Sequence, residues 1–253
     1  MLKQYKPTLD KLTKIVGKSY VLIDEQDTRH YRQGIRFGEG KVLAVVCPGT
    51  LLEQWQALQT IIEADCVVIM QAANTGLTGG STPYGDEYDR PVIIMSTRRL
   101  QGIQVILDGK QVVCLPGATL DNLERTLKPY NREPHSVIGS SCIGASVLGG
   151  VCNNSGGALV RRGPAYTEMA LYARVNESGE LELINHLGID LGNTTEEILT
   201  RLHKQDYETG QITTQTTQLA SDNRYAHDVK QVDADSPARF NKNPRRSRTT
   251  YVA

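Results

Sequence analysis

Two stretches of small, uncharged residues have the composition of a site for a phosphate-bearing ligand. The first runs from residue 70 to 81 (MQAANTGLTGGS) and follows an apolar run, residues 66–70, that is typical of a buried strand. A loop of this kind leaves several backbone N–H groups unobstructed by side chains, and such groups bind anions, typically a phosphate or pyrophosphate. By itself, the stretch is equally compatible with an ordinary turn after a strand.

The second stretch has the same character and changes the balance between these alternatives. It runs from residue 139 to 157 (GSSCIGASVLGGVCNNSGG), and it also contains no charged residue. One Gly/Ser-rich loop is common in a chain of this size. Two long uncharged loops favour two walls of one slot for a large ligand.

The usual catalytic signatures are missing from the sequence. Ser146 is followed by Val147 and Leu148, so the second Gly of a nucleophile elbow is absent, and the chain has no complete phosphate-loop motif of nucleotide hydrolases. The histidines show no metal-ligand spacing, and no metal site is predicted. The second stretch is flanked by His135 on one side and by Arg161 and Arg162 on the other. His135 is either a ligand contact or a structural histidine, and the two arginines either face a phosphate or lie in solvent. The sequence therefore indicates a binding site without an evident catalytic residue, as expected when a cofactor carries the chemistry.

The chain around the first stretch predicts the elements that position it. Residues 8–16 have the apolar spacing of a short helix, and residues 42–47 are typical of a strand buried on both faces. Thr50 and Glu53 form a capping box that starts a helix. The apolar stripe of that helix consists of Leu51, Trp55, Leu58 and Ile62. The strand at 66–70 completes a strand–helix–strand unit, with the first stretch at its carboxyl end, where open α/β sheets bind ligands.

The rest of the pattern predicts mainly antiparallel strands. Asp108–Gly109 is a hairpin signal, and residues 24–40 are polar and turn-rich. Further strands are expected at 92–95, 103–107, 111–115, 169–175 and 181–184, with a helix starting at 119. The predicted fold class is α+β: a small parallel strand–helix–strand subdomain beside a larger, mainly antiparallel sheet with helices.

Length and composition bound the class of protein. The formal net charge of the 253 residues is zero, which gives no indication of a nucleic-acid partner, and none is predicted. The five cysteines lack CxxC spacing, the N-terminus lacks a signal peptide, and no apolar run approaches the ~20 residues of a transmembrane segment. A cytoplasmic protein with at most peripheral membrane contact is therefore expected.

A change of composition predicts the domain boundary. Residues 201–253 contain only seven Val, Ile, Leu or Phe residues, too few for a core of their own. We therefore predict a domain over residues 1–200 and a polar linker or tail over 201–253. The basic cluster at 245–248 is either a solvated part of that tail or a contact for acidic lipid or nucleic acid.

At the two loops the sequence resembles the FAD-binding domain of the vanillyl-alcohol-oxidase (PCMH) flavoproteins. More narrowly, it is similar to the family of bacterial quinone-dependent D-lactate dehydrogenases. The segments that carry the resemblance are 71–78, 132–146, 162–169 and 185–192. The resemblance covers roughly residues 5 to 245 and is loosest over 201–224.

The resemblance implies a cofactor, its contacts and its partners. It implies FAD, with the pyrophosphate wrapped by the first loop and the flavin lying along the second. The implied contacts are Ala72, Ala73, Asn74, Thr75, Gly76, Gly80 and Ser81, then Gly139, Ser146 and Gly156. Covalent attachment in this superfamily often uses a histidine in the first loop; none occurs here, so non-covalent FAD is expected. D-lactate and membrane quinone are the implied partners, at the inner face of the membrane, and no catalytic residue is assigned.

The chain departs from the family at its end. Family members are longer and continue into a substrate or cap domain, whereas the resemblance stops near residue 246 and residues 247–253 look unrelated. The expectation is a truncated or frameshifted product that lacks the substrate domain. The alternatives to an active oxidoreductase are an FAD-holding fragment without turnover and a product that folds poorly.

Overall fold

A four-stranded sheet forms one half of the molecule. The computed structural model describes residues 4–208, except 37, 87, 135–139, 156–164, 166 and 168, and also the backbone of residues 249–251. Strands β1 (Val21–Leu22), β2 (Ala44–Val46), β4 (Val92–Ser96) and β3 (Val67–Gln71) lie in that order across the sheet. β1 is an antiparallel edge strand, and the other three are parallel. β4 therefore lies between the two strands of the predicted strand–helix–strand unit.

Parallel pairing brings three strand ends to one edge of the sheet. Val46 and Met70 both pair with Met95, so β2, β3 and β4 reach this edge together. All three residues of β2 are buried, which confirms the prediction of a strand covered on both faces. The first glycine-rich loop leaves the sheet at this edge, directly after Gln71.

Helices cover both faces of the sheet. Helices α1 (Lys6–Val16) and α3 (Leu51–Glu63) pack on one face around Val46, Ile93 and Met95. Tyr31 of α2 (Glu25–Arg32) packs on the other face. The Thr50 hydroxyl accepts a hydrogen bond from the Glu53 N–H at 3.1 Å, which confirms the predicted cap of α3.

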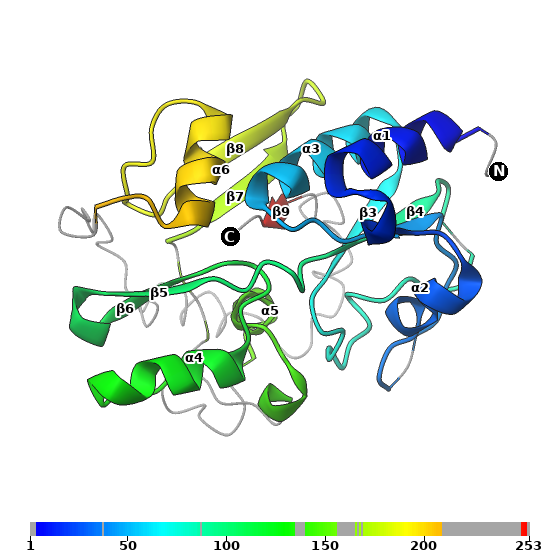
Figure 1. Cartoon of the computed structure of the whole chain (residues 1–253). Helices are drawn as coiled ribbons and strands as arrows, with labels where there is room; N and C mark the ends of the chain where they lie inside the picture. Colours follow the sequence, from blue (N-terminus) through cyan, green and yellow to red (C-terminus); the bar gives the residue numbers. More distant parts are fainter. Residues whose placement is uncertain are drawn as a thin grey trace, which may run out of the picture.

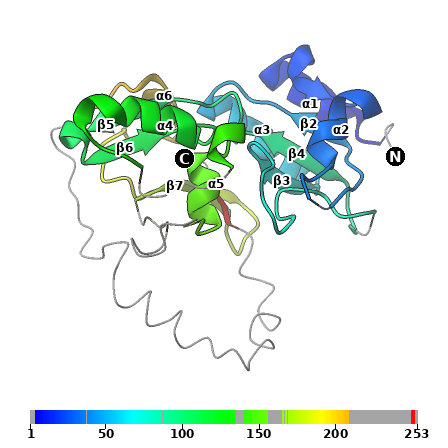
Figure 2. The same ribbon diagram turned by 90° about the horizontal axis from the view of Figure 1, so that it is seen from below.

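The antiparallel strands form a second group beside the sheet (Figures 1 and 2). β5 (Ile103–Ile106) and β6 (Gln111–Cys114) form the hairpin predicted at Asp108–Gly109. β7 (Leu171–Val175) pairs with both β8 (Leu181–Asn185) and β9 (Thr249–Tyr251). The remaining elements are α4 (Leu120–Leu127), α5 (Val147–Cys152), α6 (Thr195–Lys204) and the short 3-10 turns Lys18–Tyr20, Leu107–Gly109, Lys128–Tyr130 and Ser141–Ile143.

These elements confirm the α+β class and refine the prediction in three respects. Within the described residues the antiparallel strands belong to two separate sheets and not to one larger sheet. Residues 25–32, predicted as part of a turn-rich segment, are helical. The predicted boundary at residue 200 falls inside α6, whose Leu199 and Leu202 are buried in the main core. Residues 209–248 lie outside the described part of the chain.

One buried polar residue in α3 gives a stability prediction. Gln54 is 1% exposed, and neither polar atom of its amide has a hydrogen-bond partner among the described residues. Replacement by methionine, which has a similar shape, removes two desolvated polar atoms, so we expect the free energy of unfolding to rise by about 1 kcal/mol. Urea denaturation of the Gln54→Met chain checks this. A fall in stability would show that the amide has a partner that stabilises the fold.

Candidate functional site

The first loop presents backbone donors at its apex. Residues 76–78 and 80 are exposed, and Asn74 and Gly79 have positive φ angles of 55° and 74°. Among the described residues, no hydrogen bond is donated by the backbone N–H groups of residues 72–81. These groups are therefore available to an anionic ligand, as a loop that binds pyrophosphate requires.

Side chains hold the two ends of this loop together. The Ser81 and Thr82 hydroxyls each donate a hydrogen bond of 2.9 Å to Asn74 Oδ1. The Gln71 amide donates to the Ser81 carbonyl oxygen at 2.6 Å. These polar side chains are thus used within the protein, while the backbone N–H groups of residues 72–81 donate no hydrogen bond to described residues.

The second loop is built as a turn followed by a short helix. Gly144 adopts a φ of 92° at the end of the Ser141–Ile143 turn, a conformation that favours glycine. The buried Ser146 hydroxyl caps α5 by accepting from the Gly149 N–H at 3.0 Å. The Val147 N–H donates to the Ala118 carbonyl oxygen at 2.8 Å, which fixes the loop to the segment after β6.

The two loops meet at Gly144 and Ala73. A Cβ atom placed on Gly144 would lie 3.8 Å from the Ala73 Cβ, which is ordinary van der Waals contact. A second close approach lies in the segment that anchors the second loop: a Cβ on Gly117 would overlap the Thr97 carbonyl oxygen, so the segment after β6 crosses directly over the end of β4. The two uncharged loops therefore approach each other at Gly144 and Ala73, and their forming two walls of one slot stays a prediction.

The candidate residues differ in how they are placed. The small residues of the first loop are half-buried or exposed: Ala72, Ala73 and Thr75 are half-buried, and Gly76 and Gly80 are exposed. The side chains of Asn74, Ser81 and Ser146 are hydrogen-bonded within the protein. Gly139 and Gly156 lie outside the described residues, as do His135, Arg161 and Arg162. Contact of each candidate with a cofactor stays a prediction.

Sequence reasoning missed three residues that shape the first loop. Gln71, Thr82 and Gln33 all take part in its hydrogen bonds. A role for Gln71 and Thr82 in holding the loop was indicated in the sequence only by their positions at its two ends. Gln33 gave no signal, because it is 41 positions from its partner Asn74.

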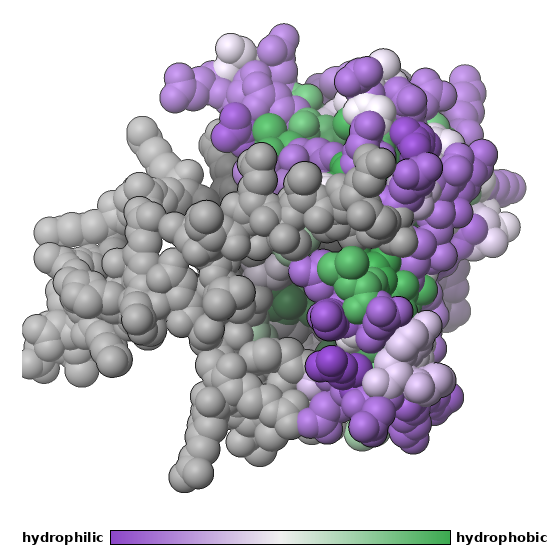
Figure 3. Space-filling model, turned by 90° about the vertical axis from the view of Figure 1, so that its left-hand side faces the viewer, coloured by the Kyte–Doolittle hydropathy of each residue, from purple (hydrophilic) through white to green (hydrophobic). Residues whose placement is uncertain are grey.

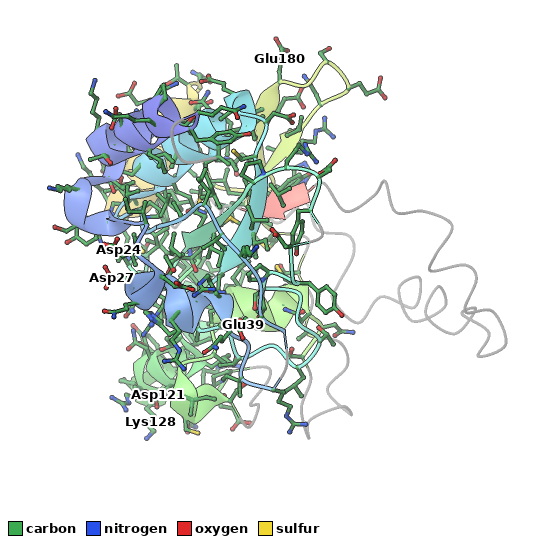
Figure 4. All side chains as sticks on the ribbon, turned by 90° about the vertical axis from the view of Figure 1, so that its right-hand side faces the viewer. Asp24, Asp27, Glu39, Asp121, Lys128 and Glu180 are labelled. Carbon is green, nitrogen blue, oxygen red and sulfur yellow. The ribbon has the colours of Figure 1, made fainter. Side chains whose placement is uncertain are left out.

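The charged residues labelled in Figure 4 come from several elements. Asp27 belongs to α2 and Asp24 is its N-cap, Glu39 follows α2, Asp121 and Lys128 lie at the ends of α4, and Glu180 lies at the tip of the β7–β8 hairpin. Figure 3 shows hydrophobic side chains only in small patches among hydrophilic ones, where the described residues are visible. No cluster of His, Cys, Asp or Glu suited to a metal ion occurs among the described residues, and no described helix is long and apolar enough to cross a membrane.

A tyrosine behind the first loop gives a pH prediction. Burial, with the neighbouring Cys47, raises the pKa of Tyr31 from its ordinary value of 10.0 to about 12. The neutral phenol is favoured in the folded state, so this contribution to stability is present below pH 10 and is lost as the pH rises through 12. Burial likewise raises the pKa of Tyr207 to about 12.

Among the described tyrosines, we therefore expect Tyr31 and Tyr207 to ionise late in an ultraviolet phenolate titration of the folded chain, and we expect the Tyr31→Phe variant to show one late step fewer. The same number of late steps in both proteins would show that Tyr31 is exposed. Far-ultraviolet circular dichroism at each pH separates titration of the folded chain from unfolding.

Comparison with known proteins supports a flavin site. Residues 42–182 match the family described as "FAD binding domain". The quinone-dependent D-lactate dehydrogenase of Haemophilus influenzae is 60% identical over 94% of this chain and 42% of that protein, and the one of Escherichia coli is 55% identical over 95% and 42%. The chain thus spans about 42% of the length of these relatives. The structure of p-cresol methylhydroxylase with bound substrate aligns with a TM-score of 0.57 at 16% identity, covering 76% of this chain and 37% of that chain, which shows the PCMH-type fold.

Proposed function

The chain belongs to the family of FAD-binding domains, and on that premise we propose that it binds FAD non-covalently where its two glycine-rich loops meet. The first loop would hold the pyrophosphate through backbone N–H groups, and the second would lie along the flavin. The proposed contacts are Ala72, Ala73, Asn74, Thr75, Gly76, Gly80, Ser81, Gly139, Ser146 and Gly156.

One observation carries this proposal. Gly144 of the second loop lies in van der Waals reach of Ala73, while the N–H groups of the first loop donate no hydrogen bond to described residues. A diphosphate requires several converging N–H donors, and a flat ring requires small residues where the backbone approaches it. The donor set and the shape of the junction therefore fit a flavin dinucleotide.

We further propose that the chain serves D-lactate oxidation with quinone as electron acceptor. The support is the similarity to two quinone-dependent D-lactate dehydrogenases, at 60% and 55% identity. Bound FAD supplies the acceptor for the two electrons that leave D-lactate when it becomes pyruvate. The residues of this chain bind and orient the cofactor. Residues 1–204 would form the FAD-binding domain, and the residues after it would be a polar linker or tail, apart from Thr249–Tyr251, which pair with β7. The protein would act at the cytoplasmic face of the membrane.

Loading the purified chain with FAD tests the first part of the proposal. We expect FAD to remain bound through gel filtration and to be released entirely into the supernatant when the protein is precipitated with acid, because the first loop has no histidine to attach it. Flavin that stays with the precipitate would contradict non-covalent binding. A colourless protein after gel filtration would overturn the site.

Anaerobic addition of D-lactate to the loaded chain separates an enzyme from a non-catalytic FAD-binding chain. The alternative without turnover is favoured by one observation: the described residues of the two loops include no acid or base that could take the hydroxyl proton of a 2-hydroxy acid. We expect FAD binding and little bleaching of the flavin by D-lactate with these residues alone. Rapid bleaching by D-lactate and not by L-lactate would show that the chain is itself catalytic.

A further inference from the structure

We propose that Gln71 and Asn74 are positioning residues, which hold the first loop in the conformation that presents its backbone N–H groups to FAD. This inference rests on the proposed function. The two amide side chains would affect FAD binding indirectly, by setting the conformation of the loop. Gln71 is 2% exposed and Asn74 is 9% exposed, so both side chains are shielded from solvent.

Asn74 joins three separate parts of the chain. Its Nδ2 donates to the Gln33 carbonyl oxygen at 2.8 Å, and its Oδ1 accepts from the Ser81 and Thr82 hydroxyls. The carbonyl oxygen of Gln33 can only accept, so Nδ2 faces it and Oδ1 faces the two hydroxyls. The amide orientation is therefore set by its partners. Asn74 also has a φ of 55°, a conformation that asparagine tolerates better than most residues.

Gln71 closes the loop at its base. Its backbone carbonyl accepts from the Thr97 N–H at 2.9 Å, which ties it to the end of β4. Its Nε2 donates to the Tyr31 carbonyl oxygen at 2.9 Å and to the Ser81 carbonyl oxygen at 2.6 Å. Loss of this amide would leave two carbonyl oxygens of buried or half-buried backbone without a donor, which is costly in a protein interior.

The Asn74 amide contacts Gln33, the first residue of a buttress that we define as the backbone of residues 33–36 and 38–41. The Gly85 N–H donates to the Glu39 carbonyl oxygen at 2.8 Å, and the Lys41 N–H donates to the Gly85 carbonyl oxygen at 2.9 Å. A Cβ on Gly40 would lie 2.7 Å from the Pro83 carbonyl carbon, so this backbone is packed tightly against the far end of the loop. The loop is thus fixed at its base by the sheet and at its return by the buttress. Its apex, including Leu77 at 56% exposure, projects beyond both.

Four variants of the full 253-residue chain test this positioning role. Gln71→Met keeps the length of the side chain and removes its donors, and Asn74→Gly keeps the positive φ and removes the amide. Thr82→Val is the mildest change, because Asn74 Oδ1 retains the Ser81 hydroxyl. Thr194→Ala is the control: it removes the cap of α6, where Thr194 Oγ1 accepts from the Glu197 N–H at 3.2 Å, and destabilises the fold away from the loop.

Two measurements are made on each folded variant. FAD affinity is measured from flavin fluorescence, and the mobility of the loop is measured without FAD as the rate of thermolysin cleavage at the Gly76–Leu77 bond, read by mass spectrometry. We expect Gln71→Met and Asn74→Gly to weaken FAD binding about tenfold and to accelerate this cleavage, with about a threefold effect on affinity from Thr82→Val. Thr194→Ala should lower the melting temperature and leave both readouts within about twofold of wild type.

The outcomes separate this inference from the proposed function. Wild-type binding of FAD together with unchanged affinity and cleavage in the loop variants would overturn the positioning role and leave the site intact. Changes in FAD affinity and cleavage rate equal to those of Thr194→Ala would likewise overturn the positioning role, because they would reflect a loss of global stability. If Gln71→Met or Asn74→Gly does not fold, Thr82→Val decides. A wild-type chain that binds no FAD overturns the proposed function, and the cleavage rates then decide whether the amides hold the loop.

Discussion

Replacement of Gly117 by alanine lowers the free energy of unfolding by about 3 kcal/mol, because the added methyl group has no space. Its Cβ would overlap the Thr97 carbonyl oxygen and lie 2.9 Å from the Leu100 carbonyl oxygen, and both are backbone atoms that cannot rotate away. The Gly117 N–H also donates to the Leu100 carbonyl oxygen at 2.7 Å, so the whole crossing over the end of β4 must shift. Urea denaturation measures this loss.

Gly150 is the matched control for this variant. It is also buried, but a Cβ placed there meets no atom of the described residues within 4 Å. It lies inside α5, where alanine is favoured over glycine by about 0.5–1 kcal/mol. We therefore expect Gly150→Ala to leave the free energy of unfolding unchanged or slightly higher. Equal losses in the two variants would mean that the crossing at Gly117 is not tight.

Replacement of Gly144 by valine produces the second large effect, on FAD affinity. Gly144 has a φ of 92°, where a β-branched residue is strained by at least about 1–2 kcal/mol. The branched side chain would also intrude where Gly144 faces Ala73, between the two loops. We expect FAD to bind at least about tenfold more weakly, measured by fluorescence titration.

A valine at Gly179 separates backbone strain from crowding between the two loops as the cause of weaker FAD binding. It has a similar φ of 83°, and a Cβ placed there meets no described atom within 4 Å, but it lies in the turn between β7 and β8. Gly179→Val should lower the melting temperature through the same backbone strain and leave FAD affinity unchanged. If both variants weaken FAD binding equally, the effect of Gly144→Val comes from lower stability of the fold. The contact between the two loops would then not contribute to FAD binding.

The elements with strong local signals were predictable from the sequence. The cap of α3 depends on Thr50 and Glu53, which are three positions apart, and the β5–β6 hairpin depends on the turn residues Asp108 and Gly109. The two glycine-rich loops were recognisable because they combine length, small residues and the absence of charge.

Features that depend on distant parts of the chain were not predictable. β4 lies between β2 and β3, and no local pattern specifies the order of parallel strands. Helix α2 has almost no apolar residue besides Tyr31, so its sequence has no helical stripe. It is nevertheless favoured by Glu25 and Asp27 in its first turn and Arg32 in its last turn, which complement the helix dipole.

The same reason explains what was missed at the site. Asn74 was predicted as a cofactor contact from its position in the first loop. Contact of Asn74 with the cofactor stays a prediction, but its side-chain amide faces the Gln33 backbone, which only the folded chain brings near. The sequence could indicate the loop as a ligand site, but it could not separate side chains that face the ligand from side chains that hold the loop.

Amide hydrogen exchange with and without FAD tests the central claim most directly, because the claim is that two loops bind one ligand. The N–H groups of residues 72–81 donate no hydrogen bond to described residues, so they should exchange rapidly in the free chain. We predict that FAD slows exchange in peptides covering both 72–81 and 140–155, and leaves the β7–β8 hairpin unchanged. Slower exchange in only one of the two loops, or in neither, would contradict the account.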